Sequence, residues 1–165
     1  MLSEKMQTAL NEQINAEYFA SYIYLSMSAY FQASNLNGFA HWMRAQSAEE
    51  MGHALKIFDY VNERGGRIVL TQVETPPSEW ESPLAVFEAA NAHERKVTGM
   101  INDLVNLAIS EGDHATNAML QWFVTEQVEE EASTGDIVHR LKMIGDLPSG
   151  LLMMDMQLGS RVDSE

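Results

Sequence analysis

The segment FAHWMRAQSAEEMGHALKIFDY, residues 39–60, has the periodicity of a buried helix but contains polar residues within its apolar stripe. Positions spaced alternately by four and three residues share one helix face and are expected to point into the core. Here they are Phe39, Met43, Gln46, Glu50, His53, Ile57 and Tyr60. The stripe is apolar towards both ends and polar in its middle. The segment therefore predicts a helix that carries a carboxylate and an imidazole inside the fold.

Three other segments have the same kind of stripe, each with an acidic residue near its middle. Their stripes are Leu10, Ile14, Glu17, Ser21, Tyr24, Ser28 and Phe31; Phe87, Ala90, Glu94, Val97, Ile101, Leu104 and Ala108; and Leu120, Phe123, Gln127, Glu130, Thr134, Ile137, Leu141 and Ile144. Four such helices predict an all-α four-helix bundle. Its interior would hold six side chains able to bind a metal: Glu17, Glu50, His53, Glu94, Gln127 and Glu130.

Capping and turn residues divide the chain into five helices. The N-caps expected for the second, third and fourth helices are Asn37, Ser82 and Asp113, and the glycines expected to end these helices are Gly65, Gly112 and Gly145. The first helix is expected over about residues 3–32. The bundle would then cover about residues 3–145, and a short, unusually apolar fifth helix would follow at about residues 149–158. We expect residues 1–165 to form a single domain.

The lengths of the connections predict the topology. Short turns join the first helix to the second and the third to the fourth, so each pair is an antiparallel hairpin. Residues 67–82 include a β-like run, Ile68 to Leu70, followed by two prolines, and they indicate a long extended connection. One crossover of this length makes the second and third helices parallel, as in a known class of four-helix bundles. The middle of every helix then lies at one level, which places the polar residues in a single layer.

Composition excludes several classes of protein. The chain contains no cysteine, which excludes disulfides and Cys-based zinc or iron–sulfur sites and fits a cytoplasmic location. No apolar run approaches the roughly 18 residues of a membrane helix, and the first residues do not resemble a secretion signal. The net charge of −14 argues against a nucleic-acid partner, because phosphate binding needs a basic face. An acidic surface of this kind either keeps a protein soluble or attracts cations.

The buried carboxylates indicate the chemistry. A carboxylate inside a bundle costs several kcal/mol unless it is paired or binds a metal. No lysine or arginine lies on the four stripes, so Glu17, Glu50, Glu94 and Glu130 have no internal counter-ion. Two divalent ions would balance four negative charges, and this ligand set with one imidazole suits iron or manganese. Glu50 neighbours His53 on one face and is the natural bridge between two ions. The alternative is a set of protonated, hydrogen-bonded polar residues.

Four motifs resemble those of the non-haem bacterial ferritins, and the match extends over essentially the whole chain. They are Asn11-Glu12-Gln13 with Glu17, the segment AEEMGH at residues 48–53, His93-Glu94, and the segment QWFVTEQVEEE at residues 121–131. Symmetric ferritin-like proteins carry Glu on two helices and Glu-x-x-His on the other two. The fourth helix here has Gln127-x-x-Glu130 instead. Within the ferritin-like proteins, the ferritins have this Gln-x-x-Glu pattern in place of Glu-x-x-His.

The resemblance implies how two iron ions would be held. Glu17, Glu50 and His53 would bind one iron. Glu50 would bridge to a second iron, which Glu94 and Glu130 would also bind.

The resemblance also implies roles around this pair. Gln127 cannot carry charge and would hydrogen-bond a bound oxygen species or water. Tyr24 matches a tyrosine linked to electron transfer, and the alternative is a core tyrosine with a satisfied hydroxyl. Gln46 is expected to hydrogen-bond a polar neighbour. Met51 raises the possibility of haem, which bacterioferritins bind through a methionine in a similar context, and ordinary packing is the alternative. Trp122 lies one position off its stripe, where packing in the core or at an interface is expected.

Three further acidic residues, Glu49, Glu126 and Glu129, lie beside the stripes. Glu126 lies three residues before Glu129 and four before Glu130, and like charges at these spacings repel each other. The resemblance implies that these positions form a third iron site between the centre and an internal cavity. A solvated acidic surface is the alternative.

The function that follows is that of an iron-storage ferritin. Such a protein acts as a ferroxidase, passes electrons from Fe(II) to O2 or hydrogen peroxide, and deposits ferric mineral in a hollow homo-oligomeric shell. The resemblance implies 24 subunits. The fifth helix is too short and apolar to stand alone in water, so we expect it to bury against symmetry mates. The rival functions are another di-iron oxidase or oxygenase, a haem-containing bacterioferritin, and a non-catalytic metal buffer.

Overall fold

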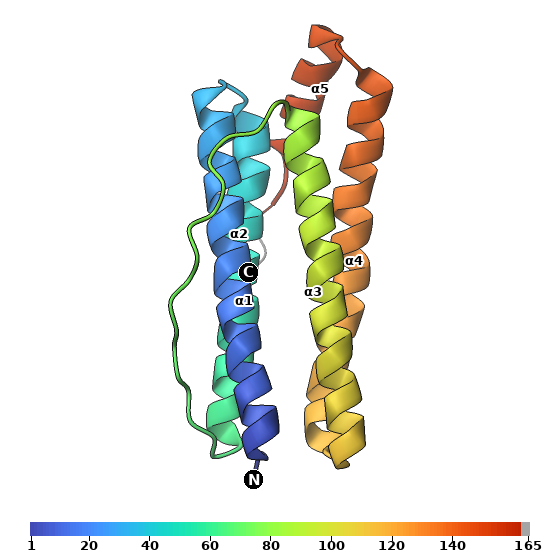
Figure 1. The fold of residues 1–165 in the computed structure, drawn as a ribbon. Coiled ribbons are helices and arrows are strands. Elements are labelled where there is room, and N and C mark those ends of the chain that lie inside the picture. Colours follow the sequence, from blue (N-terminus) through green and yellow to red (C-terminus); the bar gives the residue numbers. More distant parts are fainter. Residues whose placement is uncertain (163–165) are drawn as a thin grey trace.

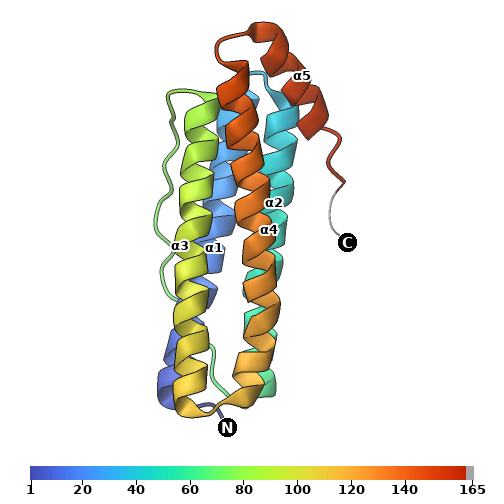
Figure 2. The same cartoon turned by 90° about the vertical axis from the view of Figure 1, so that its right-hand side faces the viewer.

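The computed structural model describes residues 1–162, and five α-helices account for most of this range (Figure 1). They are α1, Glu4–Ala33; α2, Asn37–Glu63; α3, Pro83–Glu111; α4, His114–Ile144; and α5, Pro148–Leu158. The four long helices form an upright bundle, and α5 lies across one end of it (Figures 1 and 2). The described residues contain no strand. The all-α bundle predicted from the four stripes is confirmed.

The extended connection between α2 and α3 runs along α1 from one end of the bundle to the other (Figure 1). Side chains of α1 hold it in place. Asn11 Nδ2 donates to the carbonyl of Arg67 at 3.0 Å, and Asn11 Oδ1 accepts from the amide of Val69 at 2.9 Å. Asn15 Nδ2 donates to Thr71 Oγ1 at 2.9 Å. The β-like run therefore pairs with side chains of α1, and the crossover makes α2 and α3 parallel as expected.

Most of the expected caps are present. Ser82 accepts from the amide of Ala85, and Asp113 accepts from the amide of Thr116. Gly65, Gly112 and Gly145 follow the ends of α2, α3 and α4 with positive φ angles. The expectation for Asn37 is wrong.

Asn37 is the first residue of α2, and Leu36 occupies the cap position without a side-chain hydrogen bond. The free amides at this end are satisfied from α5. Asp155 Oδ1 accepts from the amides of Gly38 at 2.8 Å and Phe39 at 3.0 Å. A carboxylate from a distant helix has therefore taken the role of a local cap.

The predicted stripes form the interior of the bundle. All their positions are buried except Tyr60 and Ile144, which are half-buried. The apolar part of the interior is divided into two clusters. One includes Tyr24, Phe31 and Phe39 near α5, and the other surrounds Leu10 and Ile14 near the N-terminus. The six metal-capable residues of the four stripes lie along the helices between these clusters, so one apolar cluster borders the polar layer on each side.

The fifth helix packs against its own chain. Met154 and Leu158 are buried in the same cluster as Phe39. Part of the apolar surface of α5 is therefore buried within its own chain, and its burial against symmetry mates stays a prediction. Leu152, Met153 and Met156 remain 60%, 72% and 79% exposed, which leaves one apolar side of α5 uncovered in the single chain. Within the described residues, no helix combines the length and hydropathy needed to span a bilayer.

Candidate metal centre

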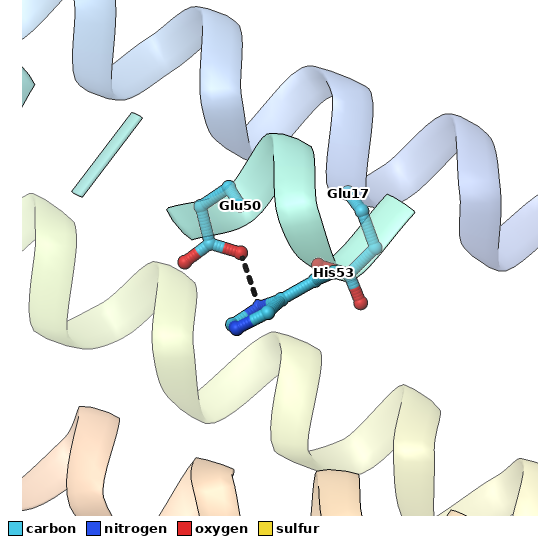
Figure 3. Close-up of side chains that lie close together, drawn as sticks. All are labelled: Glu17, Glu50 and His53. Carbon is cyan, nitrogen blue, oxygen red and sulfur yellow. Dashed lines mark hydrogen bonds and ion pairs between the residues drawn. The ribbon is translucent and has the colours of Figure 1, made fainter. Parts of the chain in front are cut away.

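The polar layer contains two groups of metal-capable side chains that share Glu50. One consists of Glu17, Glu50 and His53 (Figure 3), and the other of Glu50, Glu94 and Glu130. Within each group, one ligand atom from each residue lies within 4.8 Å of the others. All five residues are buried, with exposures of 5% or less. The antiparallel hairpins bring the middles of four helices to one level, and Glu50 lies where the two groups meet.

Few positively charged side chains in the described part of the chain are available to balance these carboxylates. Among residues 1–162, the ion pair inside the two groups joins His53 Nδ1 to Glu50 Oε2 at 3.1 Å (Figure 3). Glu17 Oε2 is buried and has no hydrogen-bond partner. A buried oxygen without a partner is costly, and coordination of a cation would satisfy it. The donor set of oxygens with one imidazole therefore fits a pair of hard divalent cations.

Amide side chains surround the carboxylates without adding charge. Gln13 Nε2 donates to Glu17 Oε1 at 2.7 Å. Gln46 Nε2 donates to Glu130 Oε2 at 2.6 Å, as expected for a neutral neighbour of the site. Gln13 was not singled out from the sequence as a partner. Its position four residues before Glu17 is the signal that would have identified it, because such residues are neighbours on a helix.

Gln127 and Tyr24 both contact Glu94. Gln127 Nε2 lies 3.3 Å from Glu94 Oε2, and the Tyr24 hydroxyl donates to Glu94 Oε1. Burial, followed by the nearby charge of Glu94, raises the pKa of Tyr24 well above its ordinary value. Tyr24 is therefore a neutral phenol in the core, and its satisfied hydroxyl is also in direct contact with a candidate metal ligand.

Aromatic residues pack around the layer. Trp122 is 40% exposed and meets the His53 ring edge-on, with 5.4 Å between the ring centroids. Lys56 Nζ lies 4.2 Å from the centroid of the Trp122 ring. His93, noted in sequence only as part of a motif, lies beside Tyr24, and burial lowers its pKa to about 4. Met51 is half-buried on α2.

The three auxiliary acids are not arranged alike. Glu126 joins His53 and Glu130 in a third group of ligand atoms within 4.8 Å of one another. Glu129 is exposed and belongs to none of these groups. Glu49 also lies outside them, and its Oε2 accepts from Arg161 Nη2 at 2.6 Å. The structure thus brings one of the three acids to the layer and pairs another with an arginine.

Burial raises the pKa of the four buried carboxyls of the layer, which are Glu17, Glu50, Glu94 and Glu130. The pKa of Glu130 reaches about 9, mainly through burial and then through the charges of Glu50 and Glu94. The pKa of Glu50 reaches about 8 through burial and the charge of Glu94. Burial is also the main reason why the pKa values of Glu17 and Glu94 are raised. Glu50 and Glu130 therefore keep their protons in the metal-free layer at neutral pH, and metal binding must release them.

The metal-free protein is expected to lose stability as pH rises. A carboxyl with a raised pKa in the folded state stabilises the fold fully below its unfolded pKa near 4.5, and this contribution disappears as pH rises through about 8 for Glu50 and about 9 for Glu130. We expect the unfolding free energy of the chelator-treated protein to fall by roughly a few kcal/mol across this window. Denaturant unfolding followed by circular dichroism at a series of pH values measures it.

Two controls distinguish the contribution of the buried carboxyls to the pH dependence of stability from general charge repulsion. Glu130→Gln should flatten part of the pH dependence, because one of the groups responsible is gone. Added Zn(II) should stabilise the protein most at the alkaline end of the window, where fewer protons compete. Equal pH dependence in the wild type and in Glu130→Gln would contradict the shifted pKa of Glu130.

Comparison with known proteins agrees with the geometry. The family model of the ferritin-like domain matches residues 7–144. The chain is 48% identical over 161 residues to the bacterial non-heme ferritin of Bacteroides fragilis (strain 638R), with 98% of this chain and 100% of the relative covered. It is 39% identical over 165 residues to that of Staphylococcus epidermidis (strain ATCC 12228 / FDA PCI 1200), with 100% and 99% covered.

Solved structures show the same likeness. The open-pore ferritin of the hyperthermophilic archaeon Archaeoglobus fulgidus superposes with a TM-score of 0.97 at 54% identity, covering 98% of this chain and 99% of that one. A humanized archaeal ferritin superposes with a TM-score of 0.99 at 53% identity over 100% of both chains. This chain therefore belongs to the ferritin family, among its non-haem members.

Proposed function

We propose how this iron-storage ferritin handles its cargo: each chain binds two Fe(II) in the polar layer and catalyses their oxidation. Glu17 and His53 would hold one iron, Glu94 and Glu130 the other, and Glu50 would bridge them. The observation that carries this proposal is the position of Glu50 in both groups of ligand atoms. A shared carboxylate holds two cations close together, so that their electrons can pass to one oxidant molecule.

The iron supplies the redox chemistry, in which each Fe(II) gives one electron to O2 or hydrogen peroxide. The protein contributes ligand geometry, charge neutralisation and a buried pocket. Glu50 and Glu130 would release their protons as the cations bind. Gln127, within hydrogen-bonding distance of Glu94 and buried, would donate its amide N–H to an oxygen atom of the oxidant or of water. Tyr24 would hold Glu94 in position through its hydrogen bond and would pass an electron.

We infer that the oxidised iron is stored as ferric oxide-hydroxide inside a hollow shell of 24 copies. The uncovered apolar side of α5, with Leu152, Met153 and Met156, supports an interface between copies, because residues of this kind are rarely left in water as a group. Residues 1–165 would act as one domain in this shell. A reducing compartment such as the cytoplasm, which the absence of cysteine fits, would keep incoming iron as Fe(II).

Beside the di-iron pair we propose a third iron position that uses Glu126, Glu129 and Glu49. The support is the group formed by Glu126, His53 and Glu130, which extends the ligand layer on one side. An iron ion held at this third position would exchange with the two ions of the di-iron pair, and the pair itself would remain. Its expected effect is on the stoichiometry of binding and on regeneration of the centre between additions of iron.

The function is tested by binding, oxidation and size together. The anaerobic protein should bind about two Fe(II) per chain tightly, and stopped-flow absorbance should show rapid oxidation when O2 is added. Sedimentation should show a large hollow particle that retains iron. Tight binding and oxidation in a small species without retained iron would favour another di-iron oxidase, and a shell without rapid oxidation would favour a metal buffer.

A further inference from the structure

Residues 159–162, which we call the C-terminal strap, follow α5 and return along α2 towards the middle of the bundle (Figure 2). Arg161 in the strap reaches Glu49 on α2. Its Nη2 donates to Glu49 Oε2 at 2.6 Å, and the two side chains are 19% and 21% exposed. A charge-assisted hydrogen bond of this length between half-buried groups is stronger than a solvated surface pair.

Further contacts hold Arg161 in this position. Its guanidinium carbon lies 4.6 Å from the centroid of the Trp42 ring, and its Nη1 donates to the Trp42 carbonyl at 3.2 Å. His41 Nε2 donates to the carbonyl of Arg161 at 2.8 Å. Backbone, ring face and carboxylate thus fix the guanidinium from three sides, so Glu49 is paired with a group that is itself well positioned.

Glu49 is electrostatically part of the iron layer even though it belongs to none of the ligand groups. Its charge contributes to the raised pKa of Glu50 and of Glu130, the latter on a different helix. Of the ion pairs within residues 1–162, only the one with Arg161 joins an arginine or lysine to a side chain proposed to bind iron. The guanidinium therefore supplies a positive charge at the edge of the layer, where the proposed third iron would also need Glu49.

We propose that Arg161 is a positioning residue that competes with a third cation for Glu49. This inference rests on the proposed di-iron function, because the third cation is defined relative to the pair. While Arg161 holds Glu49, the outer position lacks one of its carboxylates. A cation that draws Glu49 Oε2 into its coordination must displace the guanidinium, and by linkage it loosens the strap. Arg161 thus sets how readily iron occupies the position beside the pair.

The test compares cation binding in assembled, metal-free protein. Titration calorimetry with Zn(II), and anomalous diffraction after anaerobic Fe(II) soaking, should find two tight cations per chain in the wild type and in Arg161→Gln. The third cation should bind about 10-fold more tightly in Arg161→Gln, because a charge-assisted hydrogen bond no longer has to be broken. Adding Glu49→Gln to this variant should abolish the gain.

Arg140→Gln is the matched control. Arg140 also pairs with a carboxylate, Asp136, at 2.8 Å, but both side chains are exposed on α4. This substitution changes the net charge equally and should leave the third cation unaffected. Arg161→Lys keeps the charge but loses the planar fork, and should give an intermediate affinity. Arg161→Lys also provides the comparison with the wild type if Arg161→Gln assembles poorly.

A second readout follows the strap itself. Backbone amides at residues 160–162 should exchange hydrogen faster once Zn(II) exceeds two equivalents per chain, and not before. An unchanged or weaker third cation in Arg161→Gln, or unchanged exchange while the third cation binds, would reduce the ion pair to a structural clamp and overturn the proposal. Loss of the first two cations would count against the di-iron function instead, so the two failures are distinguishable.

Discussion

Glu50→Ala is expected to slow the initial oxidation of Fe(II) by more than about 100-fold, since even partners outside the ligand shell of a metal site typically contribute about 10- to 100-fold. Glu50 belongs to both groups of ligand atoms, so in the proposed centre its loss would remove a ligand from each iron and the bridge between them. Stopped-flow absorbance after mixing the anaerobic Fe(II)-loaded protein with O2 measures the rate. Equal rates in Glu50→Ala and in the wild type would show that the bridging assignment is wrong.

The same variant should fold at least as well as the wild type in the absence of metal. Glu50 is buried with a raised pKa, and removing a poorly compensated buried carboxyl is often neutral or stabilising. Glu63→Ala is the control, because Glu63 ends the same helix and is exposed. Its oxidation rate and stability should both match the wild type. A Glu50→Ala protein that fails to fold would instead indicate that this carboxyl holds the helices together.

The periodicity of the sequence was enough to predict the bundle and its polar layer. Helical spacing determines which side chains share a face, so the burial of Glu17, Glu94 and Glu130 followed from the positions of their apolar neighbours. The connection lengths predicted that the polar residues of all four helices lie at one level, since two short turns and one long crossover align the middles of the helices. These features depend on local pattern and chain length, which are both readable without coordinates.

Contacts between distant segments were not predictable in the same way. Asp155 caps α2 across more than 100 residues, and Arg161 pairs with Glu49 across a similar separation. Neither contact follows from periodicity, because both depend on how α5 turns after Gly145 and on the side of the bundle that it meets. Asn37 had the right residue type for a local cap, yet the tertiary contact from Asp155 replaced it. Local propensity is a weak guide wherever another element satisfies the same groups.

Gly38→Val is expected to detach α5 from the bundle and to weaken both the chain and the shell. A Cβ atom at position 38 would lie 1.6 Å from the backbone oxygen of Asp155 and 3.0 Å from the amide nitrogen of Gly159. Backbone atoms cannot move aside as a flexible side chain would, so α5 must shift. The shift breaks the hydrogen bonds that Asp155 Oδ1 accepts from the amides at the start of α2, and it exposes Met154 and Leu158.

The expected loss is large because several contributions disappear together. Burial of Met154 and Leu158 contributes roughly 3–6 kcal/mol, and the cap from Asp155 contributes about 1 kcal/mol. The conformational freedom that α5 regains offsets part of this, so a net loss of about 2 kcal/mol or more in the free energy of unfolding is expected. A detached α5 would also no longer present its apolar side in a fixed position, so assembly should weaken.

Denaturant unfolding and sedimentation of Gly38→Val, beside the wild type, measure both effects. Gly52→Ala is the matched control, since Gly52 lies in the same helix and a Cβ there meets no atom within 4 Å. It should keep the shell and gain up to about 1 kcal/mol from helix propensity. If Gly38→Val loses the shell while the chain keeps its full stability, α5 serves assembly alone. If it loses stability and still assembles normally, the packing of α5 on α2 is separable from its contacts with other copies.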